Sequence, residues 1–216
     1  MADAGVPQRA IDVFSDFYAQ LDGGATGMIA EADVDPLDNI AHAGEIELDD
    51  EARQAAASVT AVIKLNGGLG TSMGLDRAKT LLNAHGELTF LDVIVGQVRA
   101  LRDATGASLP LLFMNSFRTR DDTIAALAPY DDLAVDGLPI DFLQNREPKL
   151  RADDLMPVDW PADPSLEWCP PGHGDLYTAL EVSGILDALL ERGFRYATVS
   201  NADNPGAAPD PAMMAW

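Results

Sequence analysis

The sequence predicts an α/β fold in which a mostly parallel sheet is flanked by helices. Short apolar, β-branched runs alternate along the chain with segments whose apolar residues recur at helical spacing. Polar residues also follow the predicted strands directly. In parallel sheets such residues meet at one edge, beyond the carboxyl ends of the strands, where α/β proteins bind ligands. With 216 residues the chain can hold one sizeable domain or two small ones.

The elements follow in order. Residues 8–22 carry apolar residues at helical spacing and are expected to form a helix, and the acidic stretch 23–58 is expected to form short helices and a loop. The later helices are predicted over residues 90–101, 119–127 and 174–191, with a further helix beginning near residue 211. The strands are predicted over residues 59–65, 109–114, 140–143 and 194–199. We therefore divide the chain into an N-terminal helical segment, 1–58, and an α/β domain, 59–216.

Composition limits the classes of partner. The formal charge of −21 argues against nucleic-acid backbones and anionic membranes, and it favours solubility as the meaning of the acid excess. No run of apolar residues is long enough to span a membrane, and the N-terminus lacks a secretory signal pattern. Cys169 is the single cysteine and has no partner for an internal disulfide. We therefore expect a reducing, cytoplasmic setting.

A glycine-rich turn after the strand at 59–65 indicates phosphate binding. Gly67, Gly68 and Gly70 leave backbone N–H groups open to an anion, and Lys79 follows with a full positive charge. The Walker loop does not fit, because Ala78 precedes the lysine. The dinucleotide fingerprint also fails, because its third glycine is missing. The alternative from the residues alone is an ordinary strand–turn–helix junction.

Other polar residues gather at the predicted strand ends. They are Asn66, Asn115, Ser116, Gln144, Asn145, Asn201 and Asp203. A carboxylate placed like Asp203 suits Mg²⁺, which prefers carboxylate and phosphate oxygens and keeps several waters, although a turn aspartate is an equal reading. Ser116 or Thr119 is expected mainly to cap the helix that follows, and the alternative is that Asn115 and Ser116 position a bound ligand.

Five blocks in order resemble one family. They are KLNGGLGTSMG (64–74), MNSFRTRDDT (114–123), FLQNREPK (142–149), WCPPGHGDLY (168–177) and VSNADN (199–204). Together they are similar to blocks of the UTP–glucose-1-phosphate uridylyltransferase family, from about residue 10 to the end. The resemblance implies a Rossmann-like nucleotidyltransferase domain. It also implies a magnesium-dependent reaction of UTP with glucose 1-phosphate that gives UDP-glucose and pyrophosphate.

The resemblance also implies roles for individual residues. Lys79 would neutralise triphosphate oxygens and is the expected catalytic residue, and Asp203 would contact magnesium. Gln144 and Gly172 would read the uracil. The substrate-binding residues implied are Leu65, Asn66, Gly67, Gly68, Gly70, Gln144, Gly172, His173 and Asn201. Lys64 is left out, because its side chain is expected to point away from the ligand.

The sequence departs from the family in length and in detail. Family members are much longer, so we expect a partial sequence whose sheet is incomplete at its C-terminus and exposes an apolar edge. Leu143, Glu147 and Cys169 differ from the usual block residues. Three other functions stay open: use of an N-acetylhexosamine 1-phosphate, UTP binding without catalysis, and a Rossmann oxidoreductase, which the glycine spacing disfavours. The oligomeric state is not predicted.

Overall fold

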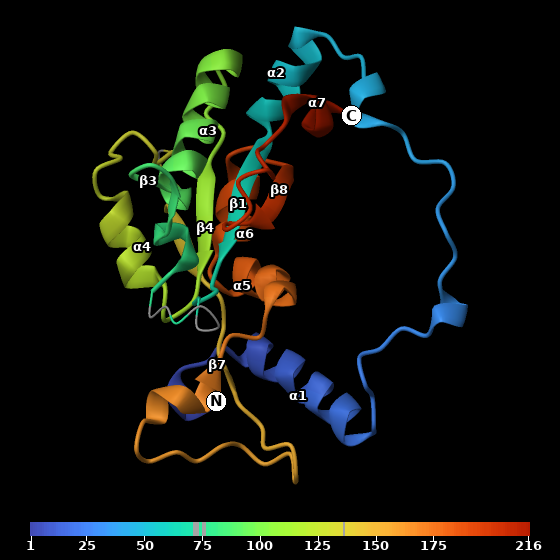
Figure 1. Ribbon diagram of the computed structural model, residues 1–216, viewed down its shortest axis with the longest axis vertical. Helices are drawn as coiled ribbons and strands as arrows, with labels where there is room; N and C mark the ends of the chain where they lie inside the picture. The colour runs from blue at the N-terminus through green and yellow to red at the C-terminus, as the bar shows by residue number, and fades with distance from the viewer. Residues whose placement is uncertain (71–73, 75–76, 136) are drawn as a thin grey trace. The chain divides into compact units, whose positions relative to one another are not determined.

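The computed structural model describes residues 1–70, 74, 77–135 and 137–216 (Figure 1). The chain forms two compact units. The larger unit comprises residues 47–145 and 170–216, and the smaller comprises residues 1–46 and 146–169. The boundary predicted from sequence, between residues 58 and 59, differs from this division. The reason is that residues 146–169 belong to the smaller unit, although they lie between two segments of the larger one.

A four-stranded parallel sheet forms the centre of the larger unit. Its strands are β1 (Thr60–Asn66), β4 (Leu111–Asn115), β5 (Asp141–Leu143) and β8 (Tyr196–Asn201), in the order β5-β4-β1-β8. All four lie within about two residues of the predicted strands. Asn66 pairs in register with Asn115, and Leu65 pairs with Asn201. The carboxyl ends of β1, β4 and β8 therefore lie side by side (Figure 1).

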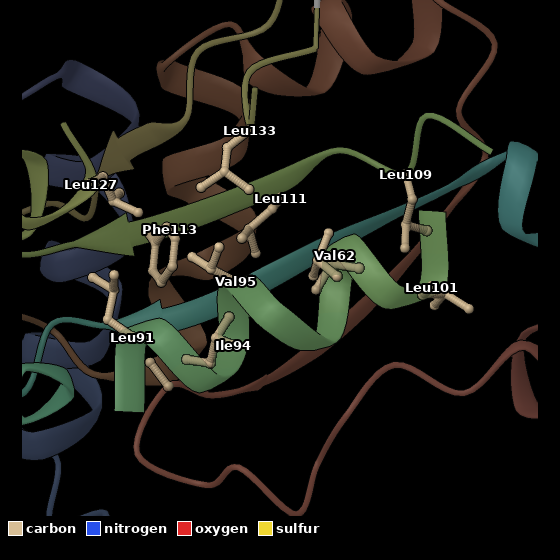
Figure 2. Close-up of a cluster of buried hydrophobic side chains, with 12 residues drawn as sticks. Val62, Leu91, Ile94, Val95, Leu101, Leu109, Leu111, Phe113, Leu127 and Leu133 are labelled. Carbon is tan, nitrogen blue, oxygen red and sulfur yellow. The ribbon is translucent and has the colours of Figure 1, made fainter. Parts of the chain in front are cut away.

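Helix α3 (Phe90–Thr105) covers one face of this sheet (Figure 1). Its N-terminus carries a capping box between Thr89 and Asp92, and it ends at Gly106, whose φ of 67° suits a glycine. Figure 2 shows its apolar side chains against those of β1 and β4. The buried cluster comprises Val62, Leu91, Ile94, Val95, Val98, Leu101, Leu109, Leu111, Phe113, Leu127, Leu133 and Ala202.

The opposite face packs against α5 (Leu176–Val182) and α6 (Ile185–Glu191). Alternate residues of β1 and β4 point to this second cluster, as the period of a strand requires. The single helix predicted over 174–191 is therefore wrong. A 3₁₀ turn (His173–Asp175) precedes α5, and Gly184, with a φ of 75°, separates α5 from α6. A left-handed residue cannot continue a right-handed helix, so the chain changes direction there.

Shorter elements complete the larger unit. They are α2 (Asp50–Ser58), the 3₁₀ turn η5 (Lys79–Leu81), the hairpin β2 (Asn83–His85) and β3 (Leu88–Thr89), α4 (Arg120–Leu127) and α7 (Pro211–Ala215). Asp49 caps α2 by accepting a hydrogen bond of 2.8 Å from the Ala52 amide, and Asp210 caps α7 in the same way. The hairpin was not predicted, because its strands are too short to show an alternating pattern.

The smaller unit contains α1 (Gln8–Asp22), which spans the predicted residues 8–22. Its other elements are four 3₁₀ turns, η1 (Ala2–Ala4), η2 (Glu31–Asp33), η3 (Ala43–Glu45) and η6 (Pro164–Glu167), and an antiparallel pair, β6 (Glu147–Pro148) and β7 (Trp168–Cys169). The guanidinium of Arg146 lies 4.9 Å from the ring centre of Trp168. Across the described residues of both units, every helix is too short or too polar to pass through a lipid bilayer.

Candidate active site

A polar cavity of about 140 Å³ lies at the carboxyl ends of β1 and β8. Its lining residues are Leu65, Asn66, Gly68, Lys79, Thr80, His173, Asn201, Ala202 and Asp203. The fold thus brings most of the predicted site residues to one place. A larger, mainly apolar cavity of about 350 Å³ runs along β8 and α7, but it holds none of these residues. We take the smaller cavity as the candidate site, because its lining includes a lysine, a histidine and a carboxylate.

Asn66 lies at the end of β1 and is saturated with internal hydrogen bonds. Its side-chain amide donates to Asn115 Oδ1 over 2.7 Å and to Thr123 Oγ1 over 2.9 Å. Its Oδ1 accepts a hydrogen bond of 2.9 Å from the Thr80 hydroxyl. Only 3 % of the residue is exposed. Because both amide hydrogens and the carbonyl oxygen are used, the side chain of Asn66 supports the site from beneath and has little capacity left for a ligand.

The same network reaches the end of β4 and the first residue of β5. Asn115 Nδ2 donates to Asp141 Oδ2 over 3.3 Å, and Arg120 Nε donates to the same oxygen over 2.7 Å. The Asp141 carboxylate is buried and raises the pKa of the Arg120 guanidinium through this hydrogen bond. One polar network therefore joins the carboxyl ends of β1 and β4, the start of β5 and the first turn of α4.

Gly67 and Gln144 touch, although they lie far apart in sequence. A Cβ atom placed on Gly67 would sit 2.1 Å from Gln144 Nε2, so a larger residue there would require the Gln144 side chain to move. Gln144 is itself buried, and its backbone N–H donates to the carbonyl of Asn115 over 2.8 Å. Gly68 differs, because a Cβ there would meet no described heavy atom within 4 Å. Gly68 is exposed and lines the cavity, so its backbone is accessible there. Gly70 is buried and does not line it.

Lys79 and Asp203 form an ion pair across the cavity. The distance from Lys79 Nζ to Asp203 Oδ2 is 3.3 Å, and their side chains are 34 % and 39 % exposed. An ion pair this exposed contributes little stability, so a ligand phosphate can replace the carboxylate beside the ammonium at small cost. Residues 71–73 and 75–76, between Gly70 and Lys79, lie outside the described part of the chain. Within that part, no group of three or more histidine, cysteine or acidic side chains is placed to hold a metal.

The turn that carries His173 begins at Gly172, whose φ is 103°, a conformation that favours glycine. His173 lines the cavity, whereas Gly172 does not. Asp175, which the sequence did not single out as a site residue, anchors this turn. It accepts hydrogen bonds from the backbone and side-chain amides of Asn145, at 2.6 and 2.7 Å. Burial raises the pKa of the Asp175 carboxyl, and the hydrogen bonds from Asn145 oppose that rise.

The capping role expected for Ser116 or Thr119 is wrong. Neither side chain caps α4. The Thr119 hydroxyl accepts from the Ser116 amide over 3.0 Å and donates to the carbonyl of Asn66 over 2.8 Å. This arrangement ties the turn before α4 to the end of β1, which no local pattern in the sequence reveals. The Asn66 carbonyl lies next to the glycine turn. Because Asn66 is buried, this carbonyl needs a hydrogen-bond donor from the protein, and the Thr119 hydroxyl supplies it.

Lys64 lies away from the cavity, as predicted. It is 1 % exposed, and its Nζ donates to Ser200 Oγ over 2.7 Å and to the carbonyl of Ala207 over 2.9 Å. Burial lowers the pKa of its ammonium group.

The parallel sheet, with a glycine turn, a lysine and a carboxylate at its carboxyl edge, is that of a Rossmann-like nucleotidyltransferase domain. A family model described as UTP–glucose-1-phosphate uridylyltransferase matches residues 11–216. Because this match covers nearly the whole chain, the protein belongs to that family.

Individual relatives agree with this assignment. The chain is 45% identical over 150 residues to UTP–glucose-1-phosphate uridylyltransferase of Solanum tuberosum, covering 69% of this chain and 31% of the relative. It is 42% identical to UTP–glucose-1-phosphate uridylyltransferase 2 of Dictyostelium discoideum, covering 71% and 30%. Its fold matches UDP-glucose pyrophosphorylase of Leishmania major with a TM-score of 0.89 and 40% identity, over 100% of this chain and 45% of that one. The chain therefore spans about a third of the curated relatives and under half of the solved structure.

Proposed function

We propose that this protein transfers the uridylyl group of UTP to glucose 1-phosphate, giving UDP-glucose and pyrophosphate. The observation that carries the proposal is the cavity at the strand ends, where the open backbone of Gly68 lies with Lys79 and Asp203. A phosphate chain needs such a combination of bare amides and a cation. The names of the relatives supply the substrates, and an L. major variant with a TM-score of 0.89 was solved with UDP-glucose.

In this proposal the protein acts by holding reactants and by offsetting charge. An oxygen of the sugar phosphate attacks the α-phosphorus of UTP in line, and pyrophosphate leaves, so no covalent enzyme intermediate is needed. Lys79 would leave its pairing with Asp203 and neutralise the departing phosphates. Gly68 would hold the nucleotide from the cavity wall, together with Gly67 and Gly70 of the same turn, which lie outside the cavity lining. Gln144 and Gly172, which also lie outside that lining, would read a uracil that extends beyond the cavity. Leu65, His173 and Asn201 would complete the cavity wall.

We also propose magnesium as the cofactor, with Asp203 as its protein ligand. Asp203 is the one carboxylate that lines the cavity among the described residues. A single carboxylate fits an ion that keeps waters and arrives with nucleotide phosphates, but not a metal held by protein ligands alone. When bound, the ion would supply positive charge that offsets the charge of the nucleotide phosphates. A cytoplasmic location is proposed from the unpaired Cys169.

Pyrophosphate release tests the proposed reaction. The protein is incubated with UTP and Mg²⁺, and with glucose 1-phosphate, N-acetylglucosamine 1-phosphate or no sugar. Release in the mixture with glucose 1-phosphate, and in neither of the other two mixtures, supports the proposal. Release that requires the N-acetylated sugar reassigns the substrate, and UTP binding without release in any mixture indicates a non-catalytic binding module.

Lys79→Met tests the site within this reaction. Methionine keeps the length and apolar stem of the side chain but removes the charge, so turnover is expected to fall at least about tenfold, the order expected for a lost charge contact in the transition state. Lys79→Arg, which keeps the charge, is the matched control and should lose less. Unchanged turnover in Lys79→Met would remove this residue from the mechanism.

A further inference from the structure

Lys64 is the most deeply buried cation in the described part of the chain, and its partners are uncharged. It lies in the middle of β1 with 1 % of its surface exposed. Its Nζ donates to a hydroxyl and a backbone carbonyl, and no described carboxylate lies within ion-pair distance. Burying an amine without a counter-charge opposes folding, and burial lowers the pKa of this one. An apolar side chain of similar length would fill the same space with a smaller free-energy cost of burial.

The two acceptors of Lys64 stand at the two ends of one segment, residues 200–207. Ser200 Oγ lies 2.7 Å from Nζ and the Ala207 carbonyl lies 2.9 Å from it. Between them the chain makes two successive turns, in which the Asn204 amide donates to the Asn201 carbonyl and the Ala207 amide donates to the Asn204 carbonyl, both over 3.2 Å. The amine of Lys64 therefore closes a loop whose ends would otherwise be joined only by a longer contact of 3.4 Å between Ser200 and Ala207.

Two further anchors fix the interior of this segment. The Ala202 amide donates to the Leu65 carbonyl over 3.0 Å, and Gln97 on α3 donates to the Pro205 carbonyl over 2.8 Å. Asp203 lies between these two anchors. Its carboxylate is not used to hold the segment from within, and it reaches the cavity and Lys79. The backbone on both sides of Asp203 is thus fastened, while its side chain stays available.

We infer that Lys64 is a positioning residue that holds segment 200–207, so that the carboxylate of Asp203 faces the phosphate-binding cavity. The role of Asp203 in this inference rests on the proposed function, whereas the fastening of the segment does not. The buried amine acts through two hydrogen bonds to the segment and makes no contact with substrate. It differs in this from Lys79, which lines the cavity.

Hydrogen exchange in Lys64→Met tests the inference on the whole chain. Loss of both hydrogen bonds is expected to speed exchange of the amides in 201–207 by at least about tenfold. These amides exchange when the segment opens locally, and the two hydrogen bonds of Lys64 oppose that opening. Amides of β4 should keep their rates, and the thermal midpoint should hold or rise, since the buried charge is gone. Ile63→Val, at the neighbouring buried position of β1, is the matched control and should leave the segment's exchange unchanged relative to β4.

Binding of Mn²⁺ with UTP, followed by electron paramagnetic resonance, gives a second measurement. The affinity of the protein for Mn²⁺ in the presence of UTP is expected to fall at least about tenfold in Lys64→Met and to stay the same in Ile63→Val. Only the Lys64 substitution removes the hydrogen bonds that keep the Asp203 carboxylate in position. If the unsubstituted protein binds no Mn²⁺, the proposed magnesium site fails, and the exchange comparison alone decides the role of Lys64.

Ser200→Ala keeps the inference testable if Lys64→Met does not fold. This change removes one of the two acceptors and leaves the amine in place, so a smaller acceleration of about threefold in the same amides is expected. Acceleration confined to 201–207 supports the inference. Equal acceleration throughout the sheet, or none in the segment, overturns it.

Discussion

At the scale of single residues, the site is organised by buried amides and hydroxyls beneath a few exposed charged groups. Asn66 illustrates this division. The sequence placed it correctly at the end of a strand, beside the glycine turn, and its family block implies contact with substrate. The structure adds that the hydrogen-bonding groups of its side chain are all bonded, to Asn115, Thr123 and Thr80. Thr80 follows Lys79 directly, so the network also fixes the turn from which the cavity lysine extends.

Thr80→Val is expected to destabilise the protein by about 1–3 kcal/mol. Valine has nearly the same shape, but it leaves the Oδ1 of Asn66 buried without its donor, and that desolvation penalty sets the magnitude. Urea denaturation measures the loss. Thr80→Ser retains the hydroxyl and should cost clearly less. Equal losses in the two variants would show that the methyl group, and not the hydrogen bond to Asn66, is what the position requires.

The raised pKa of Asp175 predicts a pH dependence of stability. The pKa of Asp175 is higher in the native state than in the unfolded chain. At pH values between these two pKa values, the native carboxyl therefore keeps a proton that the unfolded chain has lost. Stability from this group is therefore complete below the unfolded pKa and is lost as pH rises through the folded pKa. Asp175→Asn should flatten that part of the curve, measured by denaturation at a series of pH values. Asp187→Asn, at an exposed position of α6, removes the same charge and is the matched control.

At the scale of elements, glycines decide where helices stop, and the sequence could not fully reveal this. Helical spacing predicted one helix from residue 174 to residue 191, because the apolar positions continue across the break. The break depends on a single backbone angle at Gly184 and on the packing of α5 and α6 against β1 and β4. An isolated glycine in a helical pattern does not distinguish an interruption from a tolerated residue.

Substitution of two glycines by alanine is expected to have opposite signs. Gly184 has a φ of 75°, so Gly184→Ala should destabilise the protein by about 1–2 kcal/mol through backbone strain. Gly96 lies in α3, and a Cβ there would meet no heavy atom of the described residues outside its own helix turn within 4 Å. Gly96→Ala should therefore stabilise by about 0.5–1 kcal/mol. Thermal unfolding compares them, and Gly184→Asn, which tolerates this angle better, should lose less than Gly184→Ala.

At the scale of the whole molecule, the sequence predicted the strands of the parallel sheet and the grouping of its strand-end residues, because both follow from periodicity. It did not predict that residues 146–169 form a unit with 1–46. That grouping depends on contacts such as the hydrogen bond that the Arg146 guanidinium donates to the backbone carbonyl of Ala4, between residues far apart in the sequence. The side-chain partners of Asn66, Lys64 and Asp175 were hidden for the same reason, since each joins segments distant in sequence.

The outer edge of the sheet predicts how the 216-residue chain behaves at high concentration. β8 is bonded to β1 on one side and, within the described residues, to no strand on the other. Val199 and Tyr196 on this edge strand are 42 % and 66 % exposed. An apolar, unpaired edge is a template for pairing with another chain, and a lysine on it opposes such pairing. Light scattering against concentration should therefore show self-association that Val199→Lys reduces several-fold. Val34→Lys makes the same change at an exposed valine outside any strand, and it should have no such effect; an equal reduction there would attribute the result to net charge alone.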